Sequence, residues 1–288
     1  MKYSCIHTHT NFCDGKGDVD LYCQRAVEQG LYSLGFSSHA PVTKKTGFTT
    51  DWHMKDERLD EYIETVNNAK KKWKGKIKIF LGLEVDYIHG IMGPADRDYK
   101  TMGLDYIIGA VHYVSPPKGE LFTVDDSPEN VQKGLQEGFG GDPDALLNAY
   151  WENLEGLIHA GGFDVLAHPD VIKKTNNIFK FFSEESDTYR MKSEKIAAMA
   201  GDRGIIIEVN TGGMIRGKTS SPYPSLPFLK KFRKYKVPAI INSDAHNPDV
   251  LSGFYDEAIK LLLDADYKET LVLIDKKPDS PVWEKVKL

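Results

Sequence analysis

The regular alternation of short apolar runs with amphipathic stretches is the feature that most constrains the fold of this chain. Each run has strand length, is rich in β-branched or aromatic residues, and is bounded by glycine, proline or charge. The eight runs cover residues 2–7, 32–39, 77–85, 105–114, 163–168, 204–210, 237–246 and 270–275. Helical patterns separate them, most clearly at residues 59–73, 143–162, 193–204 and 256–266. Strands that alternate with helices predict a parallel sheet buried on both faces.

A single (β/α) barrel domain over residues 1–288 is the simplest fold for this pattern, with an open doubly wound sheet as the alternative. No glycine-rich turn follows the first run, which argues against a dinucleotide site. The longest stretches without periodicity are residues 41–56, 115–142 and 172–182. In a barrel they would follow strands two, four and five, so we expect them to be loops over the functional face.

Composition narrows the class of partner. The formal net charge of -5 argues against nucleic acid as the main partner. The three cysteines form no CxxC pair, which fits a reducing compartment. We find no signal-peptide pattern and no run of about 18 apolar residues, so we expect a cytoplasmic protein that does not enter the membrane. The sequence does not indicate an oligomeric state.

Histidines and acids gather where the predicted strands end. Six of the nine histidines lie at these ends. In a parallel barrel the carboxyl ends of all strands meet at one mouth, so these side chains would converge. Three acids, Asp14, Glu84 and Asp244, lie near these histidines at the strand ends. The nine candidate ligands are therefore His7, His9, Asp14, His39, Glu84, His112, His168, Asp244 and His246.

The spacing of these residues indicates a metal site. Residues i and i+2 of a strand point the same way, so His7 and His9 face one ion, and Asp244 and His246 share that spacing. Imidazole and carboxylate ligands suit Zn, Mn or Fe, whereas a thiolate-rich structural zinc site is excluded by the cysteine positions. Nine ligands are too many for one ion. Two or three divalent ions with Glu84 as a bridge would accommodate them, and such a site points to hydrolysis of a phosphate ester.

These residues resemble the motifs of the polymerase and histidinol phosphatase (PHP) family, in particular its histidinol-phosphate phosphatase branch. The matching segments are "HTHTNFCDG", "GFSSHAP", "GLEVDY", "GAVHYV", "LAHPD", "EVNTGG" followed by an arginine, and "INSDAH". The resemblance implies a distorted (β/α)7 barrel with a trinuclear metal site. Because that fold counts seven strands, the eighth run, 270–275, would lie outside the barrel or add at its edge.

The resemblance also implies three ligand sets. One ion would be held by His7, His9, Glu84 and Asp244, a second by Glu84, His112 and His168, and a third by Asp14, His39 and His246. Family members vary between His and Asp at the position of Asp14. The implied mechanism is in-line attack on phosphorus by a hydroxide that bridges the metals, and either Asp244 or His246 would help to transfer protons.

Other residues near the predicted mouth are candidates for substrate contact or support. Arg216 follows the sixth run, and its planar guanidinium suits a phosphate group. The further candidates for substrate contact are Glu208, Asn210, Trp52 and His53. Asp170 is placed to orient the imidazole of His168 as a supporting partner.

The function implied by the resemblance is a phosphomonoesterase that converts L-histidinol phosphate into L-histidinol and phosphate in histidine biosynthesis. One alternative is a relative that acts on another small phosphate ester or on a nucleotide. A metal-dependent amidohydrolase or deaminase also begins with HxH, but the additional His39 and His112, and the absence of histidine from strand six, argue against it. A non-enzymatic module of the same fold usually loses ligands, whereas every ligand position is filled here.

Overall fold

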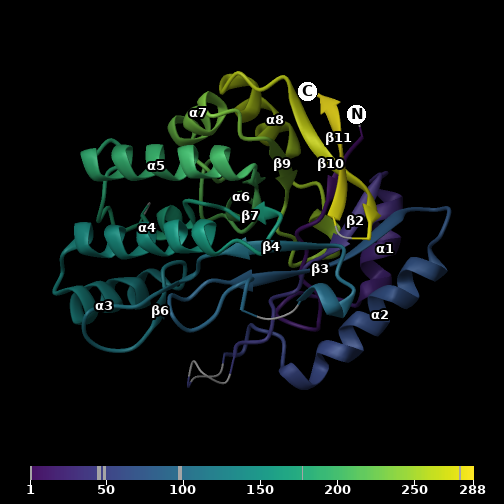
Figure 1. Ribbon diagram of the computed structural model, residues 1–288, viewed down its shortest axis with the longest axis horizontal. Helices are drawn as coiled ribbons and strands as arrows, with labels where there is room; N and C mark the ends of the chain where they lie inside the picture. Colours follow the sequence, from purple (N-terminus) through teal and green to yellow (C-terminus); the bar gives the residue numbers. More distant parts are fainter. Residues whose placement is uncertain (1, 44–46, 48–49, 97–98, 177, 279) are drawn as a thin grey trace.

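Seven parallel strands follow one another around a single sheet in chain order (Figure 1). The computed structural model describes residues 2–288 apart from 44–46, 48–49, 97–98, 177 and 279. The strands are β1 (Ser4–Cys5), β2 (Ser33–Phe36), β3 (Lys78–Asp86), β4 (Tyr106–Ala110), β7 (Val165–Leu166), β8 (Ile206–Asn210) and β9 (Ala239–Asn242). Every neighbouring pair is parallel, as the sequence pattern predicts.

The sheet curls so that its first and seventh strands meet. Thr8, beyond β1, forms a parallel bridge with Ala245, beyond β9. The backbone N–H of His9 donates to the carbonyl of Ala245 at 2.9 Å, and the N–H of Ala245 donates to the carbonyl of His7 at 3.1 Å. The distorted barrel expected from the sequence is therefore confirmed, and the open doubly wound sheet is wrong.

The eighth run forms an additional strand at the edge of the barrel. Strand β10 (Glu269–Lys277) lies parallel to β9 through the pair Leu271 and Ile240, and β11 (Ser280–Lys287) returns antiparallel to it. The hairpin brings the two ends of the chain together (Figure 1), where Lys2 pairs with Glu284 at 2.8 Å. Of the two positions expected for this run, addition at the edge is confirmed.

Helices cover the outside of the sheet on two sides in Figure 1, with α1 and α2 on one side and α3, α4, α5 and α7 on the other. The helices are α1 (Val19–Glu28), α2 (Leu59–Lys72), α3 (Pro128–Phe139), α4 (Pro143–Ala160), α5 (Asp187–Arg203), α6 (Gly212–Ile215), α7 (Leu226–Lys234) and α8 (Tyr255–Asp264). The four helices predicted from the sequence are confirmed. Helix α5 begins earlier than expected, because the hydroxyl of Ser186 accepts a hydrogen bond from the N–H of Tyr189 and caps it.

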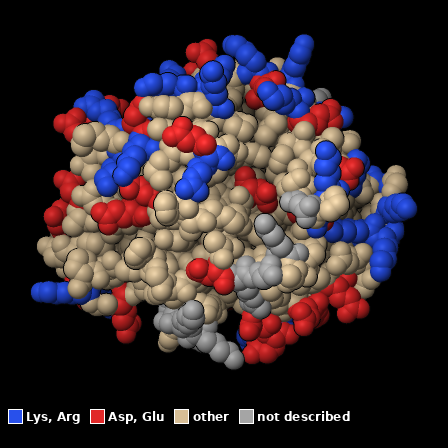
Figure 2. Space-filling model, in the orientation of Figure 1, with Lys and Arg blue, Asp and Glu red and all other residues tan. Residues whose placement is uncertain are grey.

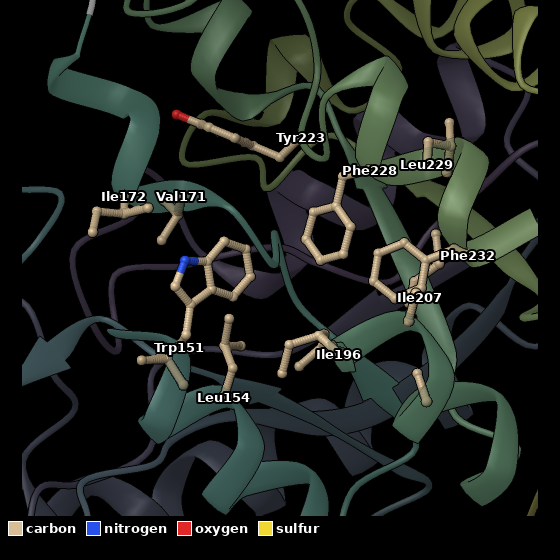
Figure 3. Close-up of a cluster of buried hydrophobic side chains, with 14 of the residues drawn as sticks. Trp151, Leu154, Val171, Ile172, Ile196, Ile207, Tyr223, Phe228, Leu229 and Phe232 are labelled. Carbon is tan, nitrogen blue, oxygen red and sulfur yellow. The ribbon is translucent and has the colours of Figure 1, made fainter. Parts of the chain in front are cut away.

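A large apolar cluster joins α4, α5 and α7 to the sheet (Figure 3). The indole of Trp151 on α4 lies at its centre and packs edge-on against the rings of Tyr189 and Phe228, at centroid distances of 5.3 and 5.6 Å. Ile207 of β8 closes the cluster from the sheet side (Figure 3). Burial of such large side chains fixes this helix layer on the barrel and so fixes the strand ends above it.

The interior of the barrel is filled by apolar side chains that surround Tyr106 of β4. A Cβ atom added at Gly82 of β3 would lie 2.5 Å from the ring of Tyr106, and one at Gly35 of β2 would touch its hydroxyl. These two glycines therefore provide the space that the tyrosine ring occupies. The hydroxyl donates to the carbonyl of Ile6, which ties β4 to β1 across the barrel.

The expected loops are partly structured. Residues 115–142 contain strand β6 (Phe122–Thr123), which pairs with β5 (Tyr113–Val114), and helix α3, so that prediction of a loop is wrong. The expected strand 105–114 likewise divides into β4 and β5 because the chain leaves the sheet at Val111 and His112. Residues 172–182 begin in the short helix η4 (Val171–Thr175). In the expected loop 41–56, residues 44–46 and 48–49 lie outside the described residues, and so does residue 177 in 172–182.

The surface carries both signs of charge. In Figure 2, lysine and arginine side chains alternate with aspartate and glutamate side chains over the face shown. Within the described residues, no helix combines the length and the apolar character needed to cross a membrane.

Candidate metal centre

All nine candidate ligands meet at the carboxyl ends of the parallel strands. Glu84 lies within β3, and the others lie in the segments that directly follow a strand. The bridges between His39 and Glu84 and between Thr8 and Ala245 hold these segments in sheet-like register beyond the regular strands. The convergence expected from the sequence is thus a consequence of parallel topology.

Glu84 lies at the centre of the cluster and is 1% exposed. Its Oε2 atom lies 3.1 Å from His7 Nε2, 3.0 Å from His39 Nδ1 and 3.4 Å from His9 Nε2. Its Oε1 atom lies 3.0 Å from His168 Nε2 and 3.8 Å from His112 Nε2. One carboxylate therefore faces five imidazoles, which is the geometry of a bridging ligand.

Asp244 and His246 close the cluster from the β9 side. Asp244 Oδ1 lies 3.1 Å from His9 Nε2 and 3.6 Å from His7 Nε2, and His246 Nε2 lies 3.1 Å from Asp14 Oδ2. Asp244 has a left-handed backbone with φ of 50°. That conformation is uncommon outside glycine and is found where the surrounding structure holds a functional side chain in place.

Several nitrogen and oxygen atoms of the cluster that could bind a metal ion are buried and have no hydrogen-bond partner among the described residues. They include His7 Nε2, His9 Nε2, His39 Nδ1 and Glu84 Oε2. Buried polar atoms are normally satisfied, so atoms that point together without a partner fit a bound cation. Imidazole nitrogen and carboxylate oxygen are the donors that Zn, Mn and Fe accept.

The pKa shifts favour the metal-binding form at His9 and Glu84, whereas neighbouring carboxylates outweigh burial and raise the pKa of His7, His39 and His112. Burial lowers the pKa of His9 to about 3, and the imidazoles of His246 and His39 act in the same direction. Burial alone would raise the pKa of Glu84, but the imidazoles of His7 and His39 hold it well below its usual range. A neutral imidazole and an ionised carboxylate are the forms that bind metal ions.

The atoms close enough to share an ion fall into four overlapping groups. Their members are His9, Asp14, His39 and His246; His7, Glu84 and His168; His7, His9 and Asp244; and His39, Asp86 and His112. The sets expected from the sequence are recognisable in these groups, but His7, His9 and His39 each belong to two groups. Asp86, which the sequence analysis did not include as a ligand, appears in one group.

Glu208 and Asn210 lie behind the cluster and do not line the cavity formed by the described residues, in contrast to the substrate contacts expected from the sequence. Glu208 Oε1 accepts from His7 Nδ1 at 2.7 Å and from the side chain of Asn242. Its Oε2 accepts from the side chain of Asn210 and from the backbone N–H of His168. Both residues therefore support His7 and His168, because strand β8 turns their side chains inward at a level below the mouth.

Asp170 also differs from expectation. Its Oδ2 atom accepts from the hydroxyl of Tyr189 at 3.1 Å and from the N–H of Ser225 at 2.8 Å, and it pairs with Lys173. No hydrogen bond joins it to His168, whose Nδ1 is among the buried atoms without a partner in the described structure. Asp170 ties the segment after β7 to helices α5 and α7 instead.

A cavity of about 380 Å³ opens above the cluster. Trp52 and Arg216 line it, as expected, together with four charged residues that the sequence analysis missed: Asp51, Asp125, Asp126 and Lys174. Lys174 Nζ pairs with Asp125 Oδ2 at 2.9 Å, and Arg216 Nη2 pairs with Asp244 Oδ2 at 2.9 Å. The position of Lys174 and Asp125 after consecutive strands at the same end of the barrel was the one signal that could have identified them.

The fold and the cluster together define an α/β-barrel protein with His, Asp and Glu side chains able to hold metal ions at the mouth of its barrel. The chain belongs to the PHP domain family, whose model matches residues 6–212. The resemblance inferred from the motifs is therefore confirmed.

Individual relatives extend over most of the chain. A protein of Deinococcus radiodurans named "Probable histidinol-phosphatase" is 27% identical over 90% of this chain and 92% of its own length. The solved structure of a candidate histidinol phosphatase from Listeria monocytogenes has a TM-score of 0.76 at 24% identity, and covers 88% of this chain and 99% of its own. Histidinol phosphate phosphatase from Lactococcus lactis, solved with zinc, L-histidinol and phosphate, has a TM-score of 0.66 at 19% identity, with 98% of this chain and 99% of its own covered.

Proposed function

We propose that this chain is a metal-dependent phosphoric monoester hydrolase whose substrate is L-histidinol phosphate. The observation that carries the proposal is the convergence of five imidazoles on the buried carboxylate of Glu84. The relative from Deinococcus radiodurans carries the same activity in its name, and the Lactococcus lactis enzyme was solved with both products of that reaction.

We assign the nine convergent residues as metal ligands for two or three divalent ions. Glu84 would bridge the ion held by His7, His9 and Asp244 and the ion held by His112 and His168, while Asp14, His39 and His246 would form the third set. Divalent ions held there would lower the pKa of water and neutralise charge on the phosphoryl oxygens. Zinc is the metal found with the Lactococcus lactis enzyme, and it suits these donors here.

The residues around the ions have separate tasks in this proposal. Arg216 contacts both the side chain and the backbone carbonyl of Asp244, so its guanidinium is fixed at the cavity wall with the geometry to receive a phosphate oxygen. Lys174 provides a second cation on that wall. His246 is partly exposed and lies beside Asp244 and Arg216, which places this ligand at the open side of the cluster, next to the proposed phosphate site.

A phosphate-release assay tests the proposal. Purified protein, with and without added Mn or Zn, would be compared on L-histidinol phosphate, a nucleoside monophosphate and an aryl phosphate. We expect a strong preference for L-histidinol phosphate and a loss in His9→Ala that exceeds the about 10- to 100-fold typical of a residue that only supports a ligand. His159→Ala, which changes an exposed histidine of α4, is the matched control and should retain full activity.

The possible outcomes test the substrate and the phosphatase activity separately. Equal and weak release from all three substrates would leave a metal phosphatase but remove L-histidinol phosphate as its substrate. No release from the fully metal-loaded protein would overturn the phosphatase itself. Cell fractionation would test the expected cytoplasmic location separately.

A further inference from the structure

His53 is buried in a chain of hydrogen bonds behind the cavity wall. It is 7% exposed, and both of its ring nitrogens are in use. Nδ1 lies 2.7 Å from the hydroxyl of Thr50, and Nε2 lies 2.8 Å from Asp86 Oδ2. Among the described residues that line the cavity, His53 does not appear, so the direct substrate contact expected from the sequence is not what this geometry provides.

Asp86 links this chain to the metal centre. Its carboxylate is 1% exposed and accepts from two imidazoles, His53 through Oδ2 and His112 through Oδ1 at 2.7 Å. The bond to His112 Nδ1 leaves His112 Nε2 to face Glu84.

Trp52 is the neighbour that this arrangement places over the cavity. Its ring lies 3.7 Å from the ring of His53 by centroid distance, and it is nearly parallel to Tyr113, with 13° between the planes. Trp52 lines the cavity, and the carboxylates of Asp51 and Asp126 line the same space, as does Asp125, which is paired with Lys174. A flat aromatic face beside negative charge suits a flat ring that carries a proton.

We propose that His53 is a positioning residue that, anchored through Asp86, holds Trp52 as the wall against which the ring of the leaving group stacks. The identity of that ring as an imidazole rests on the proposed function, whereas the support of Trp52 by His53 does not.

Three variants test the proposal. His53→Phe keeps an aromatic ring beside Trp52 but removes both hydrogen bonds, and His53→Gln retains an N–H that can reach Asp86. Trp52→Phe is made alone and in combination with each His53 variant. Subtracting the spectrum of each protein without Trp52 from that of its counterpart with Trp52 gives the fluorescence of Trp52, free of the other three tryptophans. This readout requires no substrate and no turnover.

We expect the Trp52 emission to shift to longer wavelength in His53→Phe, because the indole becomes more exposed, and to return toward the wild-type spectrum in His53→Gln. We expect KM for L-histidinol phosphate to rise about tenfold in His53→Phe because one stacking contact is lost, and we expect this rise to exceed any fall in kcat. KM for a phosphate ester without a ring should not change. His53→Gln should recover most of the affinity.

Two results would overturn the proposal. An unchanged Trp52 spectrum in His53→Phe would show that His53 does not hold the indole. Loss of bound metal with a fall in kcat on every substrate would show that His53 acts on His112 and not on Trp52. If wild-type protein released no phosphate at all, the fluorescence comparison would still decide the role of His53, so this failure is distinguishable from failure of the proposed function.

Discussion

At the scale of single residues, the centre depends on side chains that do not face the cavity. Glu208 is fully buried and holds His7 through the 2.7 Å contact with Nδ1. Glu208→Gln retains the shape but removes the charge that favours this contact, so we expect metal affinity or activity to fall about 10- to 100-fold. Metal titration against a competing chelator measures the affinity. Glu257→Gln, at an exposed site on α8, is the control, and equal affinities in the two variants would contradict the prediction.

The same residues show where sequence reasoning reaches its limit. The position of a polar residue at a strand end predicts that it faces the mouth, and all nine candidate ligands do converge. Depth along the strand is decided by tertiary packing, which no local pattern reports. Glu208 and Asn210 therefore have the right parity but lie behind His7. Lys174 carries no periodic signal in its segment.

At the scale of elements, the alternation of apolar runs with amphipathic stretches predicted the strands and four helices. Helix α3 was not predicted, because its apolar residues show only a weak helical period. Ser127 caps α3 and Gly140 ends it in a left-handed conformation, so the boundary signals were present in the sequence. The buried face of α3 is formed by few apolar residues, and its glycines weaken the helical pattern further. Its partner hairpin β5–β6 has strands of two residues each, too short to be recognised by alternation.

The interior of the barrel offers a prediction at this scale. Gly82→Ala in β3 would place a methyl group against the ring of Tyr106, and overpacking of this kind lowers the free energy of unfolding by about 1–3 kcal/mol. Chemical denaturation measures the change. In the background of Tyr106→Leu the added methyl group has room, so the cost of Gly82→Ala should fall there. The same cost in both backgrounds would mean that the ring is not what excludes a side chain at Gly82.

At the scale of the whole molecule, the proposed metal ions would stabilise the closure of the barrel. The ligands follow β1, β2, β4, β7 and β9 and include Glu84 of β3, so the bound ions would join the first strand to the seventh, where Thr8 and Ala245 form the closing bridge. Ligands that bind the folded chain alone stabilise it by mass action, by about 2.7 kcal/mol when present at 100 times Kd. Removal of metal should therefore lower the midpoint of thermal unfolding, and added Zn or Mn should restore it in proportion to the logarithm of its concentration. Circular dichroism during heating measures this, with His9→Ala as the variant expected to respond weakly. A wild-type midpoint that is the same with chelator and with saturating metal would show that the cluster does not bind these ions in the folded protein.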